Sequence, residues 1–284
     1  MAYVVHLFLS VFIELFYPDD SWLNELEDFD HMVKYDTINL AEVGADPDVL
    51  ENNTVYPLVP VTREDNKITA TLSTFDTKPT HVTDVEDMNV DYKKTKSVMG
   101  QHINSLRTKC SKSGAYNMSP QTNTADAPVL KTTGAKNARG FKALTFEDVT
   151  NLSLAFDEAD IPQEGRVIVL CPQHKTDLKN ENIKLYKAMM SDKEIDGFKI
   201  YTHTGNPTYD PATGAKSPYG ALTGNPSSFA FYKARTLRAR GSVTAEAERH
   251  FATYRGTLVG AQVRFVAMPL GKKAVGAIYS DTAA

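Results

Sequence analysis

The segment spanning residues 55–84, VYPLVPVTREDNKITATLSTFDTKPTHVTD, most constrains what this chain can fold into. Apolar residues alternate with polar ones on both sides of a polar turn at residues 63–67, which predicts a β-hairpin with one apolar face. The apolar residues of this stripe are Val59, Val61, Ile68, Ala70 and Leu72. The other face carries mostly Thr and Ser. Because a two-stranded hairpin is marginal alone in water, we expect this one to lie against another surface.

The composition is that of a folded protein and argues against a dedicated nucleic-acid binder. The chain has 284 residues, 42% of them hydrophobic, which is enough for one large domain or two ordinary ones. Its formal net charge of −4 differs from the clustered basic charge of DNA- and RNA-binding domains, so any contact with nucleic acid is expected to be weak. Cys110 and Cys171 stand in no metal-binding spacing, and we interpret both as reduced and buried.

Residues 1–20 predict an amphipathic helix and no membrane anchor. The apolar stretch 3–17 is shorter than the roughly 20 residues that span a bilayer, and it contains His6 and Glu14. No basic region or cleavage site marks a secretory signal. Apolar residues recur at helical spacing, namely Val4, Phe8, Val11 and Leu15. The pattern fits a helix that docks into a protein groove, and it also fits a helix packed in this chain's own core.

An acidic run follows at residues 19–53, where Asp and Glu are frequent and Lys34 is the single lysine. Such a run is hard to collapse into a core of its own, so it predicts an arm that follows a surface. The helix, the arm and the hairpin therefore fill about the first 85 residues with little that could bury any of them.

A long helix is predicted over residues 92–118. Its apolar stripe consists of Met99, Ile103, Leu106 and Cys110, and most of its lysines lie off this stripe. The basic face is interpreted as a solvated surface or, alternatively, as a contact for an acidic neighbour such as the arm. A connection rich in Ser, Thr, Pro and Gly follows at residues 119–140.

The remainder of the chain predicts mixed α and β structure. Thr145 and Asp148 form a capping pair at the start of a helix over residues 145–160, and 166–171 is a continuous apolar run typical of a buried strand. Further elements are predicted as a helix at 173–190, strands at 197–203, 228–234 and 257–270, and a charged stretch at 235–256. The Gly- and Pro-rich segment 204–226 is long for a loop, which predicts a shaped surface element.

No motif in the sequence indicates catalysis, a cofactor or a metal. The chain contains neither a Walker phosphate loop nor the G-x-G-x-x-G fingerprint of dinucleotide-binding proteins. None of its histidines are paired at the helical spacing of metal ligands, and no serine stands in a nucleophile-elbow motif. We therefore expect no enzyme, with an α/β enzyme or small-ligand-binding protein built around 166–171 as the alternative from another class.

Seven segments, taken in order, carry a resemblance to a known family. They are FYPDDSWLNE (16–25), INLAEVGADPDVLENNTVYPLVPV (38–61), GQHINSLRTK (100–109), IPQEGRVIVLCPQHKTDL (161–178), GFKIYTH (197–203), SSFAFYKARTLRARG (227–241) and TLVGAQVRFVAMPL (257–270). Their order resembles that of the major capsid proteins of tailed bacteriophages, which share the Hong Kong 97-like fold. The resemblance runs over nearly the whole chain.

The resemblance implies an α+β fold with four parts. These are an N-terminal arm at 1–51, an extended β-hairpin called the E-loop at 52–87, a peripheral domain with a long spine helix at 88–142 and 234–268, and a mixed α/β axial domain at 143–233 and 269–284. In this arrangement the hairpin lies on a neighbouring subunit, so that assembly buries its apolar stripe. The loop 204–226 would project toward a neighbour within the capsomer.

The function implied is that of a capsid subunit that forms pentamers and hexamers of an icosahedral shell around phage double-stranded DNA, in a virion assembled in the host bacterial cytoplasm. Expected partners are other copies of the chain, a separate scaffolding protein, a portal, decoration or head-completion proteins, and weakly the packaged DNA. No membrane, cofactor or metal is expected. The assembly-interface residues implied are Phe8, Val11, Leu15, Val59, Val61, Arg63, Lys67, Ile68 and Leu72. An encapsulin-type nanocompartment of the same fold is the nearer alternative.

Overall fold

The computed structural model describes residues 21–42, 51–54, 66–83, 93–221, 223–249, 256–271 and 273–282. Its helices are η1 (Trp22–Glu25), η2 (Asp30–Met32), α3 (Lys93–Met118), α4 (Phe146–Glu158), α5 (Pro172–Glu181), α6 (Ile183–Asp192) and η3 (Lys233–Arg235). Its strands are β1 (Thr37–Glu42), β2 (Asn66–Thr71), β3 (Ser73–Asp76), β4 (Thr80–Thr83), β5 (Val129–Lys131), β6 (Arg166–Leu170), β7 (Glu194–Ile195), β8 (Phe198–Thr202), β9 (Thr208–Tyr209), β10 (Asn225–Tyr232), β11 (Thr236–Arg249), β12 (Gly256–Pro269) and β13 (Val275–Tyr279).

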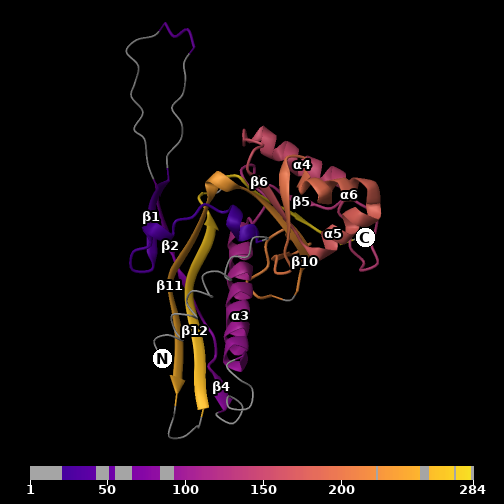
Figure 1. The fold of residues 1–284 in the computed structure, drawn as a ribbon. Coiled ribbons are helices and arrows are strands. Elements are labelled where there is room, and N and C mark those ends of the chain that lie inside the picture. The colour runs from indigo at the N-terminus through magenta and orange to yellow at the C-terminus, as the bar shows by residue number, and fades with distance from the viewer. Residues whose placement is uncertain are drawn as a thin grey trace.

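These elements form two bodies, and the chain passes between them more than once. Figure 1 shows an elongated body, in which β11 and β12 run alongside the spine helix α3, and a second body in which α4, α5 and α6 lie around another sheet. The elongated sheet has the order β11-β12-β3, with β4 also paired to β12. The second sheet has the order β5-β13-β10-β6-β8-β7, with β9 paired to β10. Helices and both sheets together give the predicted α+β class.

The second sheet has two apolar faces, and each is covered by helices. Ile168 and Leu170 of β6 join the core beneath α4, α5 and α6, whereas Val167 and Val169 join the core that includes α3. All residues of β6 are buried, as predicted for a continuous apolar run. The predicted capping pair is confirmed, since the Thr145 side chain accepts from the Asp148 N–H and the Asp148 side chain accepts from the Thr145 N–H.

The elongated sheet separates two apolar cores. Its spine face, which carries Phe75, Val263 and Phe265, packs with α3. Its opposite face, which we call the turn face, carries Leu72, Leu237, Ala239 and Val266 and is covered by Ile38 and Ala70. Between β3 and β4 the ladder is bridged by Thr77, whose hydroxyl accepts from the Ala261 N–H at 2.9 Å.

Two predicted elements differ from the structure. Residues 235–256 were predicted as a charged stretch, but 236–249 form β11, because Leu237 and Ala239 point into the turn-face core while the arginines between them point the other way. The single helix predicted at 173–190 is two helices, since the backbone of Asn182 is extended and its side chain accepts from the N–H groups of Lys184 and Leu185 to start α6.

The hairpin also pairs differently from the prediction. Strand β2 pairs with β1, from Thr37 opposite Thr71 to Glu42 opposite Asn66, so its described partner lies upstream of the predicted first arm. Strands β3 and β4 pair with β12 and so belong to the elongated sheet. The alternation of apolar and polar residues on both sides of 63–67 predicted that β2 pairs with the segment just before that turn. Strand β1, with the sequence TINLAE, instead supplies the matching apolar residues Ile38 and Leu40.

A buried histidine ties the second sheet to α5. His174 is fully buried, with Nδ1 2.7 Å from Ser228 Oγ and Nε2 2.9 Å from Ser280 Oγ. Burial lowers the pKa of His174 to about 3. The ring is therefore neutral in the folded protein throughout the neutral pH range.

We expect acid to destabilise this body through His174. The unfolded chain has a histidine pKa near 6.5 and the folded chain one near 3, so between these values the unfolded state binds the extra proton and the free energy of unfolding falls as pH falls. The slope is up to about 1.4 kcal/mol per pH unit, and the term is constant above pH 6.5. Thermal melting at about pH 7.5 and about pH 5 measures it. His174→Gln, which cannot titrate, should show a shallower dependence, and an equal dependence would contradict the assignment.

Candidate assembly surfaces

The start of the described chain is held in the junction between the two bodies by Trp22. This side chain is 3% exposed, and its indole N–H donates to Ser111 Oγ of α3 at 3.2 Å. Its ring meets Phe229 edge-on at 5.3 Å between centroids and lies 6.0 Å from the ring of His203. His203 Nε2 in turn lies 2.9 Å from Ser111 Oγ. The arm, the spine helix and the second sheet therefore share one buried polar and aromatic contact.

Backbone and charged groups then bind the arm along the edge of β11. The Arg238 N–H donates to Glu27 O at 2.8 Å and the Phe29 N–H donates to Arg238 O at 2.9 Å. Arg238 Nη2 pairs with Asp28 Oδ2 at 3.0 Å, and Asp30 Oδ1 accepts from the Arg240 N–H at 2.6 Å. Burial raises the pKa of Asp30 despite this hydrogen bond. The arm thus covers the first part of an edge strand.

A further carboxylate joins the arm to β8. Glu25 Oε1 accepts from Lys199 Nζ and from the Tyr201 hydroxyl, each at 2.6 Å. Burial alone would raise the pKa of Glu25, but these two hydrogen bonds lower it below its usual value. The acidic run was predicted to lack a core, and for residues 21–36 this is corrected, since Trp22 and Leu23 are buried within the same chain.

The predicted interface residues fall into two groups. Phe8, Val11, Leu15, Val59, Val61 and Arg63 lie outside the described residues. Lys67 pairs through its backbone with Ala41, and Ile68 is half-buried opposite Leu40. Leu72 is only 5% exposed, because it is buried in the turn-face core of the same chain. This corrects the expectation that a neighbouring subunit buries its side chain.

The long loop 204–226 is fastened to the end of α3. Lys216 Nζ donates to Ser119 O at 2.7 Å and to Tyr116 O at 2.9 Å, and it lies 4.2 Å from the centroid of the Tyr116 ring. Burial lowers the pKa of Lys216 to about 8. The Tyr209 hydroxyl donates to Pro120 O at 2.5 Å. The loop therefore caps carbonyl groups that the helix leaves unpaired at its C-terminus.

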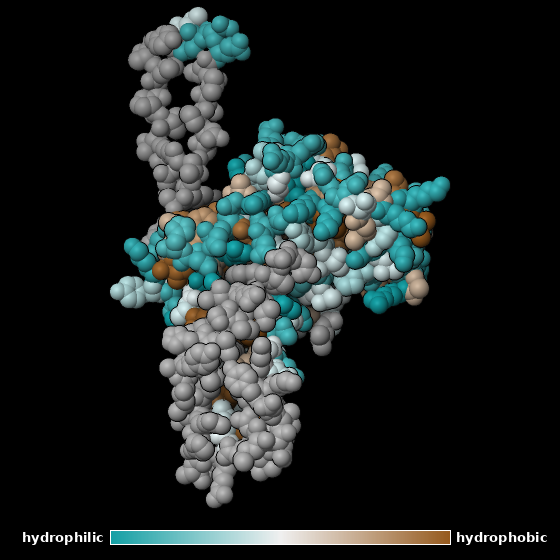
Figure 2. All heavy atoms as spheres, in the orientation of Figure 1, coloured by the Kyte–Doolittle hydropathy of each residue, from teal (hydrophilic) through white to brown (hydrophobic). Residues whose placement is uncertain are grey.

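Apolar side chains remain exposed on the second body and on the arm. Ile183 and Leu185 of α6 are 53% and 51% exposed, and Leu154 of α4 is 54% exposed. Figure 2 shows separate hydrophobic patches over the α4 and α6 region of the second body. These residues were not predicted as interface residues from the sequence. One signal was present, since Ile183 and Leu185 stand two positions apart and one helical stripe cannot bury both.

The most exposed aromatic side chain stands on a tight turn. Tyr35 is 100% exposed, and both Tyr35 and Asp36 have positive φ, at 47° and 63°. The Lys34 and Thr37 backbones exchange two hydrogen bonds of 3.0 Å across the turn. Asp36 forms an ion pair with Arg264, and its carbonyl accepts from the Leu72 N–H at 2.9 Å. The turn is thus fixed on the turn face while the ring stands in solvent.

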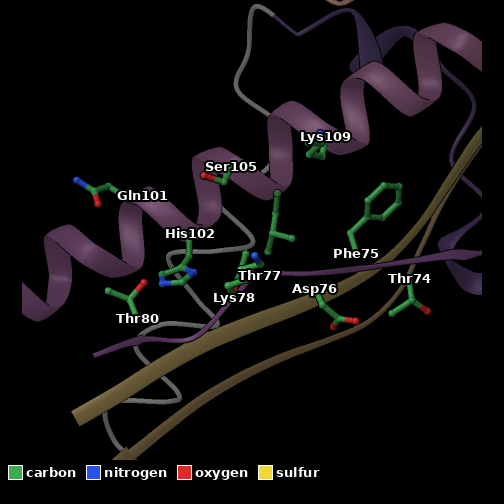
Figure 3. Close-up of a pocket in the computed structure, with 11 residues that line it drawn as sticks. Thr74, Phe75, Asp76, Thr77, Lys78, Thr80, Gln101, His102, Ser105 and Lys109 are labelled. Atoms are coloured by element: carbon green, nitrogen blue, oxygen red, sulfur yellow. The ribbon is translucent and has the colours of Figure 1, made fainter. Parts of the chain in front are cut away.

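A pocket opens on the other side of the same sheet. It measures about 590 Å³ and lies between α3 and the β3–β4 segment, as Figure 3 shows. Its lining includes Phe75, Thr77, Lys78, His102, Leu106 and Lys109. Burial lowers the pKa of His102, so its ring is neutral at neutral pH. The lining combines two aromatic rings and a leucine with hydroxyl and ammonium groups, the Asp76 carboxylate and the Gln101 amide.

Groups that could support catalysis or metal binding are few in the part of the chain that the structure describes. No set of three His, Cys, Asp or Glu side chains is placed there to hold a metal ion. Cys110 and Cys171 are buried free thiols, and burial raises the pKa of Cys110 to about 12. Within the same described residues, none of the helices has the length and apolarity needed to cross a bilayer.

Two glycines of α3 provide a matched test of the arm contact. A Cβ on Gly114 would stand 3.2 Å from Ala267 Cβ and 3.3 Å from Trp22 Cη2, whereas nothing lies within 4 Å of one on Gly100. We expect Gly114→Leu to displace Trp22 and lower the free energy of unfolding by about 1–3 kcal/mol. Because Trp22 is the only tryptophan, its fluorescence emission should shift to the red. Gly100→Leu should leave emission and stability nearly unchanged, and a similar red shift in both variants would contradict the contact.

Lys216 provides a test of the loop anchor. We expect Lys216→Met to lower the free energy of unfolding by about 1–3 kcal/mol, because the carbonyls of Tyr116 and Ser119 lose their donor. Urea denaturation measures this loss. Lys179→Met, which removes an exposed lysine from α5, should change stability by no more than about 0.5 kcal/mol. Equal effects of the two substitutions would show that the buried ammonium does not anchor the loop.

Sequence comparison gives no match to any protein-family model and none to a curated protein. Comparison with solved structures gives many matches along most of the chain. The capsid of Ralstonia phage GP4 matches with a TM-score of 0.66 at 8% identity, covering 96% of this chain and 91% of the phage chain. The capsid of cyanophage P-SCSP1u matches with a TM-score of 0.64 at 16% identity, covering 91% and 87%.

A third match extends the same likeness beyond phages. A virus-like particle from Pyrococcus furiosus matches with a TM-score of 0.60 at 12% identity, covering 95% of this chain and 96% of that one. At these identities the likeness concerns the fold. The predicted architecture is confirmed at this level: the chain has the Hong Kong 97-like α+β fold seen in phage capsids.

Proposed function

We propose that this chain is the major capsid subunit of a tailed bacteriophage and assembles into an icosahedral shell around double-stranded DNA. The observation that carries the proposal is the match to phage capsid structures over more than nine-tenths of the chain. A likeness confined to one sheet would fit many functions, whereas this one includes the spine helix, the elongated sheet and the second body together.

The exposed apolar residues support the same proposal. Exposure of Ile183 and Leu185 on α6 and of Leu154 on α4 to water is unfavourable. Burial of these side chains by another subunit would lower the free energy. Further contacts are proposed for the predicted residues Phe8, Val11, Leu15, Val59, Val61, Arg63, Lys67 and Ile68. The proposed partners are copies of this chain as pentamers and hexamers, with a portal, a scaffold and head-completion proteins, in a virion formed in the bacterial cytoplasm.

A structural role also suits the chemistry of the described residues. His174 is neutral and enclosed by two serines, and the thiol of Cys110 is buried with a raised pKa, so neither is placed to attack a substrate. We therefore propose no enzymatic activity. Contact with packaged DNA is proposed to be weak and non-specific, in keeping with the net charge of −4.

A protein shell that encloses other cargo is the second candidate. It rests on the virus-like particle from Pyrococcus furiosus, whose chain is covered almost completely. The two candidates share the fold and differ in what the shell contains. Nuclease treatment followed by analysis of the particle contents separates them: protected DNA favours the capsid, and a co-purifying protein favours the compartment.

The proposal is tested by assembly of the full chain. We expect sedimentation velocity and electron microscopy to show capsomers or closed shells as protein concentration rises, because assembly follows mass action. Replacing residues 44–64 with a short Gly-Ser linker should leave the thermal melt nearly unchanged, because the β1–β2 ladder stays intact, and should abolish shells. A linker of the native length with scrambled sequence serves as control for chain length. A stable monomer under all conditions would refute the shell proposal, and a collapse of the melt would place residues 44–64 in the chain's own core.

A further inference from the structure

Tyr35 occupies a position that its residue type disfavours. A two-residue turn with positive φ at both positions suits Gly, Asn and Asp, and an L-residue with a bulky side chain carries a conformational cost there. The cost is not offset within the chain, since the ring is 100% exposed. The surrounding bonds nevertheless fix the turn, through the Lys34–Thr37 pairing and the Asp36–Arg264 ion pair. Strain held by its surroundings is typical of functional positions.

The pocket beside α3 has the chemistry to receive such a side chain. Half-buried Phe75 offers a ring on which an aromatic side chain can pack, beside the nearly buried His102 and Leu106. Lys78 and Lys109 offer ammonium groups, and Asp76 a carboxylate, for the ring face or the phenol hydroxyl. A wholly apolar side chain would leave these polar groups unpaired. At about 590 Å³ the pocket also has room for part of the turn that carries the ring.

We propose that Tyr35 of one copy of the chain inserts into the α3–β3 pocket of a second copy. This inference rests on the proposed shell function. The two features cannot meet within one chain, because Asp36 pairs with Arg264 on the turn face whereas Phe75 and Leu106 belong to the core on the spine face of the same sheet. The sheet β11-β12-β3 stands between them.

Such a contact is heterologous, since each copy gives a projection on one side and a pocket on the other. A heterologous contact repeated by rotation closes into a ring, which pentamers and hexamers require, whereas a contact between identical patches ends at a dimer. Tyrosine is also among the side chains that contribute most to interface energies when they fill a desolvated pocket. The contact therefore joins two subunits through an exposed side chain on one copy and a surface pocket on the other.

Substitutions at Tyr35 separate assembly from folding. Tyr35→Asn removes the ring but suits the positive φ, so the melting temperature should stay equal or rise by about 2 °C while the concentration needed for assembly rises at least tenfold. Tyr35→Phe keeps the ring and should assemble within about threefold of the original chain. Lys179→Asn, which removes an exposed side chain of α5 that belongs to no proposed contact, should assemble normally. Normal assembly of Tyr35→Asn would overturn the proposal.

Cross-linking between two different chains tests the pairing itself. Full-length Tyr35→Cys and Lys78→Cys chains are mixed, assembled and oxidised; we expect a disulfide-linked dimer that neither variant forms alone, because the native cysteines are buried. Lys179→Cys, an exposed position on α5, mixed with Lys78→Cys should give none. A short bismaleimide is used in a parallel reaction, because it links cysteines that are too far apart for a disulfide. If shells form but neither reagent links position 35 to position 78, this inference is overturned and the shell function still stands. Absence of any assembly by the unmodified chain would instead overturn the shell function.

Discussion

The burial of Trp22 between α3 and the second sheet is the contact on which the two bodies depend. A single indole meets Phe229 and His203 and donates to Ser111, so it contacts both bodies at once. Gly114 of α3 leaves the space that the indole needs, at the cost of helix stability that glycine always carries. Once Trp22 is seated, the acidic residues that follow it come to lie beside Arg238, Arg240 and Lys199.

Patterns that depend on neighbouring residues predicted the structure well. The capping pair Thr145–Asp148, the buried strand β6 and the spine helix α3 all follow from spacing within a few turns or a few residues. Pairing between distant segments could not be predicted in the same way. Strand β2 pairs with β1, because registers of comparable apolar match compete and only the tertiary context selects one.

The functional surfaces were the least predictable part. Strand β11 was not predicted, because Arg238 and Arg240 alternate with Leu237 and Ala239 and make the segment look charged. Their acidic partners lie in the arm, some 210 residues away in the sequence. Leu72 was predicted to be buried by a neighbouring subunit, but it is buried in the core of its own chain. Tyr35 gave no signal in the sequence, because exposure and backbone conformation together make it unusual. Among the described residues, most large apolar side chains are covered by this chain itself.

The Thr77 bridge satisfies the backbone of β12 between β3 and β4. Elsewhere along β12 the ladder is made of paired backbone groups, which hold two strands at a fixed separation. At Ala261 the N–H is received by a side-chain hydroxyl that turns about a single χ1 bond. The Ala261 C=O accepts from the Thr77 N–H at 2.9 Å, so both backbone groups of Ala261 keep a partner where the strand ladder is interrupted, and the edge of β12 offers no unpaired group there to another strand.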